Sequence, residues 1–128
     1  METRQLPRFP IELNTKINID HPDEQGFNIA KKDIETKIVD ISILGICMLS
    51  KYFIPRGVII KFDIKIKDEI LESKGEVKSA VPAGTASTRL GVQFVDMSSE
   101  YRNKIADFIK EYERRAMPRI KIPDKGVL

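Results

Sequence analysis

The sequence has a single cysteine, a single histidine and no long apolar run, and each scarcity excludes a class of structure or site. Cys47 cannot form an internal disulfide, and its apolar neighbours predict a buried, inert thiol, which fits a reducing cytoplasm. His21 has no cysteine or second histidine near it, so we interpret it as a loop residue rather than a metal ligand or catalytic base. No apolar run approaches the roughly 20 residues of a membrane span, and the residues after Met1 lack the apolar core of a signal peptide.

The sequence also lacks the patterns that carry catalysis. It contains no glycine-rich phosphate loop and no cluster of residues at metal-ligand spacing. Asp40 and Ser42 are the one carboxylate and hydroxyl whose mutual geometry can be predicted, and no base accompanies them locally. We therefore expect a protein that is not an enzyme and that uses no metal and no cofactor.

The positive charge is concentrated near the C-terminus. The 128 residues, 41% hydrophobic and 32% charged, are enough for one globular domain with a core. Residues 114–128 hold five basic side chains and one acidic, a net of +4, which leaves 17 basic and 18 acidic side chains for the rest of the chain. A protein that tracks long nucleic acid needs a basic surface on its folded part. We therefore interpret the basicity as mainly a property of a solvated C-terminal tail and expect no long nucleic acid as a partner.

Alternating apolar and polar residues predict a chain of strands. The pattern is clearest in residues 11–19, 58–67 and 88–95. Further strands are predicted at residues 34–42, 46–49 and 70–81, with Gly75 as a candidate break in the last, and the turn-rich residues 20–33 predict a long hairpin connection. Six strands that are each apolar mostly on one face indicate a small antiparallel barrel or sandwich.

One helix is predicted after the strands. Ser98 or Ser99 can cap its N-terminus, and Met117-Pro118 ends it. Its apolar residues recur at the spacing of a single stripe, which predicts a helix that packs on the strands. The stripe consists of Tyr101, Ile105, Phe108, Ile109 and Tyr112.

The stretch Asp40-Ile41-Ser42-Ile43-Leu44-Gly45 interrupts the most apolar part of the sequence. If residues 38–42 are extended, Asp40 and Ser42 lie on one face, and Val39, Ile41 and Ile43 lie on the core side. Gly45 follows where the chain bends or where another group approaches the backbone closely. The simpler alternative is a strand end with an Asx-type or serine-type turn that the glycine closes.

Two arginines precede the first strand. Pro7 and Pro10 disfavour helix around Arg4 and Arg8, and in an extended loop the two arginines can be up to about 13 Å apart. A guanidinium group matches phosphate and also the O6/N7 edge of guanine, so the pair can hold separate parts of one anionic ligand. The simpler alternative is two solvated arginines at a chain terminus.

These motifs together resemble the PilZ domain, a family of bacterial receptors for the second messenger cyclic di-GMP. The motifs are Arg4-x-x-x-Arg8, Asp40-x-Ser42-x-x-Gly45 and Leu90-Gly91-Val92-Gln93-Phe94, and the resemblance covers about residues 3–113. It implies a mainly β fold, a six-stranded antiparallel β-barrel with one C-terminal α-helix. The predicted domain spans residues 1–115 including the N-terminal loop, and residues 116–128 form the basic tail.

The resemblance also implies roles for the motif residues. Arg4 and Arg8 would hold guanine bases and phosphates, and Asp40 would read a guanine edge. Ser42 would bond the ligand, and Gly45 would leave room for it. Because no output domain is recognisable, the signal is expected to pass from a ligand-ordered N-terminal loop to an unidentified downstream protein. Thr3 stands where some members carry a further arginine that accompanies two stacked ligands, which favours one ligand molecule per chain.

Two other functions remain open at this stage. The same fold can serve as a protein–protein interaction module that binds no nucleotide, although the complete motif set argues against this. A small barrel can also bind single-stranded nucleic acid, but the near-neutral charge outside the tail and the few aromatic residues on polar faces oppose that reading.

Overall fold

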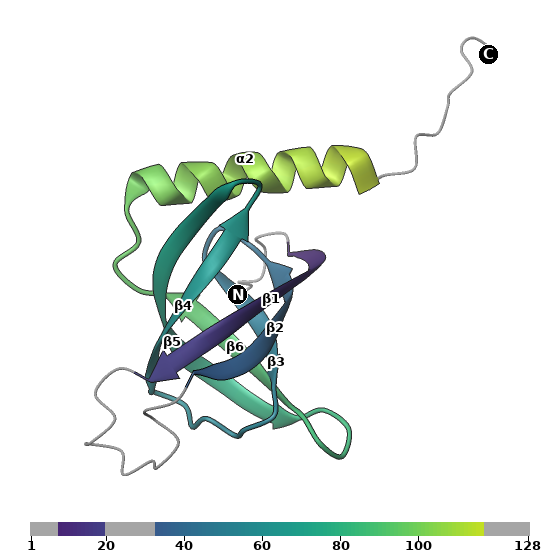
Figure 1. The fold of residues 1–128 in the computed structure, drawn as a ribbon, viewed down its shortest axis with the longest axis vertical. Coiled ribbons are helices and arrows are strands. Elements are labelled where there is room, and N and C mark those ends of the chain that lie inside the picture. The colour runs from purple at the N-terminus through teal and green to yellow at the C-terminus, as the bar shows by residue number, and fades with distance from the viewer. Residues whose placement is uncertain (1–7, 20–32, 117–128) are drawn as a thin grey trace, which may run out of the picture.

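The chain forms a closed barrel of six antiparallel strands with a helix across one end (Figure 1). The computed structural model describes residues 8–19 and 33–116, with side chains up to Glu111. Arg4, His21, the 20–32 connection and the tail from residue 117 therefore lie outside the described residues. The strands are β1 (Phe9–Ile19), β2 (Ile34–Ile41), β3 (Gly45–Ser50), β4 (Ile59–Ile66), β5 (Glu69–Pro82) and β6 (Thr88–Phe94), and the helix is α2 (Ser99–Ala116).

The strand order around the barrel is β1-β2-β3-β6-β5-β4, so the six strands and the helix predicted from the sequence are confirmed. The predicted break at Gly75 is wrong, because β5 passes through it while pairing with Ile60 on one side and Phe94 on the other. A Cβ atom at this position would clash with the Val92 side chain. Gly75 therefore gives room for core packing inside a continuous strand.

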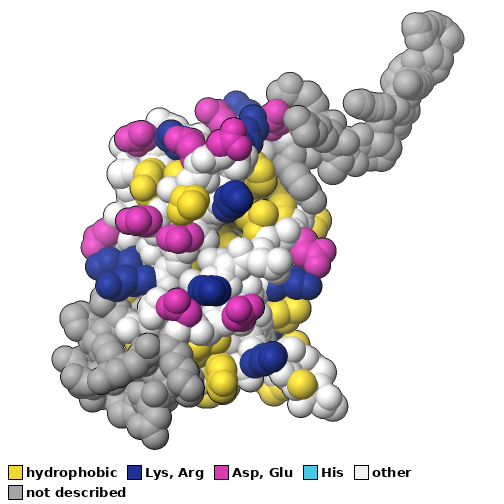
Figure 2. Space-filling view, in the orientation of Figure 1, with side chains coloured by type: hydrophobic (Ala, Val, Ile, Leu, Met, Phe, Trp, Pro, Cys, Tyr) yellow, Lys and Arg dark blue, Asp and Glu magenta, His cyan; other side chains and the backbone are white. Residues whose placement is uncertain are grey.

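Branched aliphatic side chains fill the barrel. Along β4 the even-numbered residues from Ile60 to Ile66 are buried, and the lysines and aspartate between them are exposed. Phe62 and Phe94 stack in the same core with ring centroids 6.4 Å apart. Leu90, Val92 and Phe94 of β6 point inward as the alternation predicts. On the face drawn in Figure 2, basic and acidic side chains are interspersed rather than gathered by sign.

Helix α2 covers the barrel end that carries the β4–β5 turn (Figure 1). Ile105 and Ile109 are buried in the core, and Tyr101 and Phe108 pack against it. Ser98 provides the cap, since its Oγ accepts a hydrogen bond from the Tyr101 amide at 3.1 Å. The predicted stripe is thus confirmed except at Tyr112, whose side chain lies outside the described part. Within that part, no helix has the length and apolar character needed to cross a membrane.

Polar contacts also fix α2 to two separate parts of the barrel. Lys104 pairs with Glu69 at 2.6 Å, and Glu111 pairs with Lys67 at 2.6 Å, both at the β4–β5 turn. Arg102 donates from Nη1 to the Ile43 carbonyl oxygen at 3.2 Å, in the loop between β2 and β3. The helix therefore contacts the β2–β3 loop as well as the β4–β5 turn.

The pairing of β3 with β6 requires a glycine at the start of β3. A Cβ atom on Gly45 would clash with the Val92 carbonyl oxygen, which is a backbone atom and cannot move without opening the pairing. We expect Gly45→Ala to lower the free energy of unfolding by about 1–3 kcal/mol, measured by urea denaturation.

The matched control is Gly91→Ala in the facing strand. There a new Cβ would lie 2.6 Å from the exposed Ser79 hydroxyl oxygen, which can rotate away. Equal losses of stability in the two variants would contradict the assignment of a special backbone contact to Gly45.

Candidate functional site

Four residues with small or short side chains lie in one line across the outside of the barrel. Asp40 of β2 pairs with Cys47 of β3, Cys47 pairs with Gly91 of β6, and Gly91 pairs with Ser79 of β5. Neighbouring residues on β3 and β6 point into the core, so this line belongs to the outer surface. We call these four residues the cross-barrel row.

Pairing is irregular on β2 and β5, which the row crosses, and on β1, which lies beside its Asp40 end. The register shifts between Ile38 and Asp40 on β2, and between Val77 and Ser79 on β5. β1 shifts just after Pro10, which pairs with Asp40. A β-bulge places an extra residue opposite one partner residue and re-aims the side chains beside it. The row therefore has altered side-chain directions at both of its ends.

The bulge on β2 corrects one prediction. Ile38 and Ile41 are both fully buried, with two residues between them instead of one. Strict alternation predicted that Val39 faces the core with Ile41, but Val39 is only partly buried. The extra residue changes the phase of the alternation, and Asp40 remains on the outer face.

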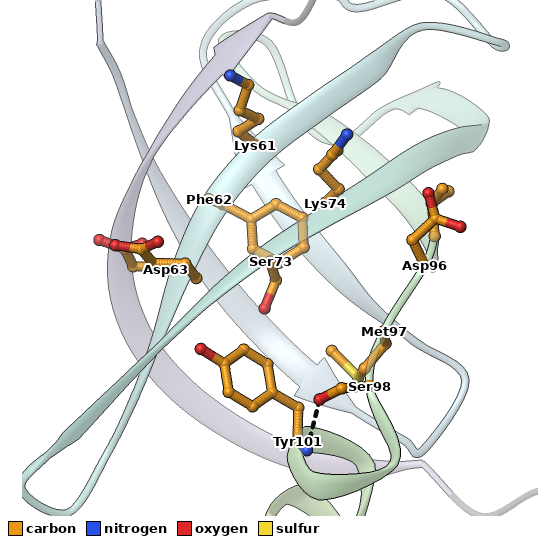
Figure 3. A pocket seen from close by; sticks show the side chains of 11 residues that line it. Lys61, Phe62, Asp63, Ser73, Lys74, Asp96, Met97, Ser98 and Tyr101 are labelled. Atoms are coloured by element: carbon orange, nitrogen blue, oxygen red, sulfur yellow. Dashed lines mark hydrogen bonds between the residues drawn. The ribbon is translucent and has the colours of Figure 1, made fainter.

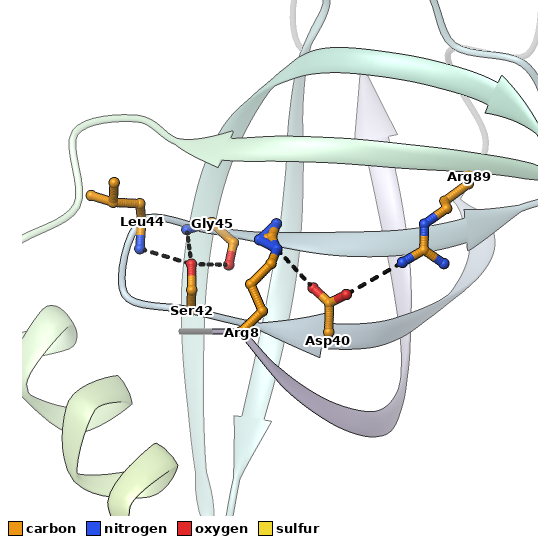
Figure 4. A network of polar contacts seen from close by, with 6 residues as sticks. All are labelled: Arg8, Asp40, Ser42, Leu44, Gly45 and Arg89. Atoms are coloured by element: carbon orange, nitrogen blue, oxygen red, sulfur yellow. Dashed lines mark hydrogen bonds and ion pairs between the residues drawn. The ribbon is translucent and has the colours of Figure 1, made fainter. Parts of the chain in front are cut away.

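Asp40 is bound between two arginines (Figure 4). Its Oδ1 lies 3.6 Å from Arg8 Nε, and its Oδ2 lies 3.4 Å from Arg89 Nη2. The carboxylate side chain is only 16% exposed, whereas those of Arg8 and Arg89 are 44% and 48% exposed. Oδ1 is buried and has no hydrogen-bond partner among the described residues. Because a buried acceptor is normally satisfied, Oδ1 lacks a donor, which a ligand can bring only if the groups that cover this oxygen move aside.

Arg89 was not identified as a site residue from the sequence. The alternation placed it on the outer face of the last strand, which is correct, but gave it no partner. It lies 49 positions from Asp40 and reaches it across β3. The register of β6 against β3 brings the two together, and no local pattern in the sequence encodes that register.

Ser42 shapes the turn between β2 and β3. Its Oγ accepts hydrogen bonds from the Leu44 amide at 3.2 Å and the Gly45 amide at 3.3 Å, and it donates to the Gly45 carbonyl oxygen at 3.3 Å (Figure 4). The Ser42 amide also donates to that carbonyl oxygen, at 2.8 Å. The side chain is buried, so its hydroxyl faces the loop and does not lie open beside Asp40. The serine-type turn closed by glycine is therefore present, and the ligand roles of Ser42 and Gly45 stay predictions.

A cavity of about 380 Å³ lies at the Gly91–Ser79 end of the row and extends to the β2–β3 loop and Arg8. Three of the predicted residues, Arg8, Ser42 and Gly45, line it, and Asp40 adjoins it through Arg8. Its other lining residues come from the β2–β3 loop, β5 and β6, and are Leu44, Lys78, Ser79, Gly91, Val92 and Gln93. The structure thus brings together four of the five predicted residues, while Arg4 lies outside the described part of the chain.

A larger cavity of about 590 Å³ lies between β4, β5 and the segment before α2 (Figure 3). It contains none of the predicted residues. Lys61 and Lys74 line it together with Asp63, Glu72 and Asp96, so its rim has no excess of positive charge. This mixture makes it a poorer match to a phosphate-bearing ligand than the cavity beside Asp40.

Cys47 lies in the row beside the Asp40 carboxylate. The residue is 6% exposed, and this burial raises the pKa of its thiol, as does the negative charge of Asp40, while Arg89 and Arg8 oppose the shift. A thiol with a raised pKa stays protonated and unreactive at neutral pH. The predicted burial of Cys47 is therefore confirmed, and its inertness stays a prediction. Among the described residues, no group of three or more His, Cys, Asp or Glu side chains is placed to hold a metal ion.

Solved structures with the same fold include cyclic di-GMP complexes. The PilZ domain of YcgR from Escherichia coli, solved with c-di-GMP, superposes with a TM-score of 0.62 at 13% identity, covering 90% of this chain and 98% of that one. The Bacillus subtilis inhibitor of motility MotI/DgrA superposes with a TM-score of 0.68 at 12% identity, covering 91% of this chain and 55% of that one. At these identities the likeness shows the fold.

Sequence comparison identifies the family. An uncharacterized protein of Aquifex aeolicus (strain VF5) is 28% identical over 95 residues, which are 73% of this chain and 46% of that protein. The chain thus spans about half the length of this curated relative. The family model described as PilZ domain matches residues 2–111. Because that match covers most of the 128 residues, the chain belongs to the PilZ domain family.

Proposed function

We propose that this protein is a receptor for cyclic di-GMP and not an enzyme. The observation that carries the proposal is the Asp40 carboxylate, which is held between Arg8 and Arg89 at the edge of the 380 Å³ cavity and keeps a buried oxygen without a hydrogen-bond partner among the described residues. Membership of the PilZ family and the c-di-GMP complexes of structurally similar proteins support the choice of ligand.

The chemistry of the residues fits this ligand. Guanine offers N1 and N2 hydrogens, which a carboxylate accepts, and an O6/N7 edge, which an arginine fork matches. In the free protein, Arg89 lies 3.4 Å and Arg8 lies 3.6 Å from an oxygen of Asp40, and both distances are longer than those of a strong charge-assisted hydrogen bond. A bound ligand can replace these weak contacts with shorter charge-assisted bonds, from guanine to Asp40 and from the arginines to phosphate. Arg4 would add a second N-terminal guanidinium to the same ligand.

We also propose that the protein acts in the cytoplasm as an adaptor. Binding would fix residues 1–8 against the barrel, and the ligand together with this segment would form a new surface for a separate partner protein. Fixing a backbone residue costs about 1–2 kcal/mol in conformational entropy, so ordering the segment would offset part of the contact energy. The barrel side of the site is formed already, since Asp40, Ser42 and Gly45 lie on paired strands or in a hydrogen-bonded turn.

Isothermal titration calorimetry with cyclic di-GMP tests the binding. We expect the wild-type chain to bind, Arg8→Ala to lose most of the affinity and Asp40→Ala to bind more weakly. Because the Arg8 side chain is 44% exposed, its truncation leaves no cavity, and the melting temperature of the Arg8→Ala variant should differ little from that of the wild type. Arg56→Ala is the matched control, because Arg56 is an exposed arginine in the β3–β4 loop that does not line this cavity.

Two results would contradict the assignment. Absence of binding by the wild type at ligand concentrations on the order of tens of micromolar would refute the receptor function and favour an interaction module that needs no nucleotide. In that case, a partner protein would be captured equally well with and without cyclic di-GMP. Normal binding by Arg8→Ala together with a large fall in melting temperature would make Arg8 a structural residue.

Amide hydrogen exchange tests the ordering of the N-terminal segment. We expect cyclic di-GMP to slow exchange mainly at residues 3–9, with smaller effects at residues 40–45, because the latter are already hydrogen-bonded. The core strand at residues 58–66 serves as the internal control and should be nearly unchanged. Full protection of the N-terminal amides before ligand is added would show a preformed pocket instead of an ordering switch.

A further inference from the structure

The cavity has a second charged end, which the sequence motifs do not include. The bulge on β5 pairs Val77 with Val92 and then Ser79 with Gly91, so Lys78 is the extra residue between them. Lys78 and Ser79 are both exposed, and both line the cavity that Arg8 lines from the opposite side. The bulge thus directs two consecutive side chains, a cation and a hydroxyl, to one cavity, which regular alternation could not do.

The cavity has room for a flat ligand beside Ser79, because Gly91, which lines it there, has no side chain. From Asp40 to Ser79 the row crosses three inter-strand spacings of about 4.8 Å, or roughly 14 Å in all. A ligand that contacts both ends must therefore carry polar groups on opposite sides of an extended body. A cyclic dinucleotide, with two guanines and two phosphodiesters, has this form, whereas a single nucleotide reaches only one end.

The charge at the second end is available to an anion. Lys78 Nζ lies 3.3 Å from Glu76 Oε1, and the two side chains are 52% and 35% exposed. An exposed pair of this kind contributes little to stability, so an incoming phosphate can compete with Glu76 for the ammonium group. Ser79 Oγ can donate a further hydrogen bond to the same phosphate.

We propose that Lys78, together with Ser79, holds one phosphate of the cyclic dinucleotide at the β5 end of the cavity, while Arg8 and Asp40 hold a guanosine at the β2 end. This inference rests on the proposed binding of cyclic di-GMP and assigns a further binding residue within that site. It also explains why the ligand is a dinucleotide, since both charged ends are needed for full affinity.

Charge-reversal variants test the role of Lys78 by calorimetry with cyclic di-GMP. Lys78→Glu should weaken binding at least about tenfold, because it removes one charge-assisted contact and adds repulsion of the phosphate. Lys65→Glu is the matched control, since it makes the same charge change at an exposed position of β4 outside the cavity, and we expect a change of less than about twofold. Glu76→Gln should act in the opposite direction and strengthen binding by about two- to threefold, because it removes the competitor for Lys78.

The outcomes separate this inference from the function on which it rests. If the wild type binds and Lys78→Glu and Lys65→Glu lose equal affinity, the effect at Lys78 is one of overall charge. That result would overturn the inference and leave the receptor function intact. Wild-type binding that Lys78→Glu leaves unchanged would overturn it as well. A wild-type chain that does not bind cyclic di-GMP would refute both. Thermal melting of each variant confirms that the exposed substitutions leave the barrel folded.

Discussion

The pairing of β3 with β6 is the interaction on which the candidate site depends. It joins the β2–β3 hairpin to the β5–β6 hairpin, and both contribute side chains to the cavity. Only this pairing brings Arg89 to Asp40 and places Gly91 between Cys47 and Ser79. The two strands approach so closely at Gly45 that a side chain there would clash with the β6 backbone. The β3–β6 pairing, with its close approach at Gly45, is therefore part of both the barrel wall and the candidate site.

Irregular pairing positions two charged groups of the candidate site, Asp40 and Lys78. In a regular strand, successive side chains alternate between the core and the surface, so one residue in two can face a ligand. The β2 bulge leaves Asp40 outside between the buried Ile38 and Ile41, and the β5 bulge turns Lys78 and Ser79 to the same side. Each bulge gives up regular ladder pairing at one residue, and the two occur where the cross-barrel row meets its outermost strands.

Features that depend on neighbouring residues in the sequence could be predicted, and features that depend on contacts between distant strands could not. Strands such as β4 were predictable because apolar and charged residues alternate from Ile60 to Ile66, and α2 was predictable from its apolar stripe and serine cap. The proximity of Arg8 and Asp40 followed from the family resemblance. Arg89 and Lys78 were not found as site residues, because their positions depend on strand register and on bulges, which arise from contacts between distant parts of the chain. Val39 was misplaced for the same reason.

The long sequence separation of these contacts has a consequence for folding. Asp40 meets Arg89 across 49 positions, and Ile43 meets Arg102 across 59, so neither contact can form until distant strands and the helix have docked. Loops of this length close late and slowly compared with a single hairpin. The complete site therefore exists only in the closed barrel, and a partly folded chain lacks it. Any ligand that recognises the complete site will stabilise the native state by mass action and will favour it over open forms of the chain.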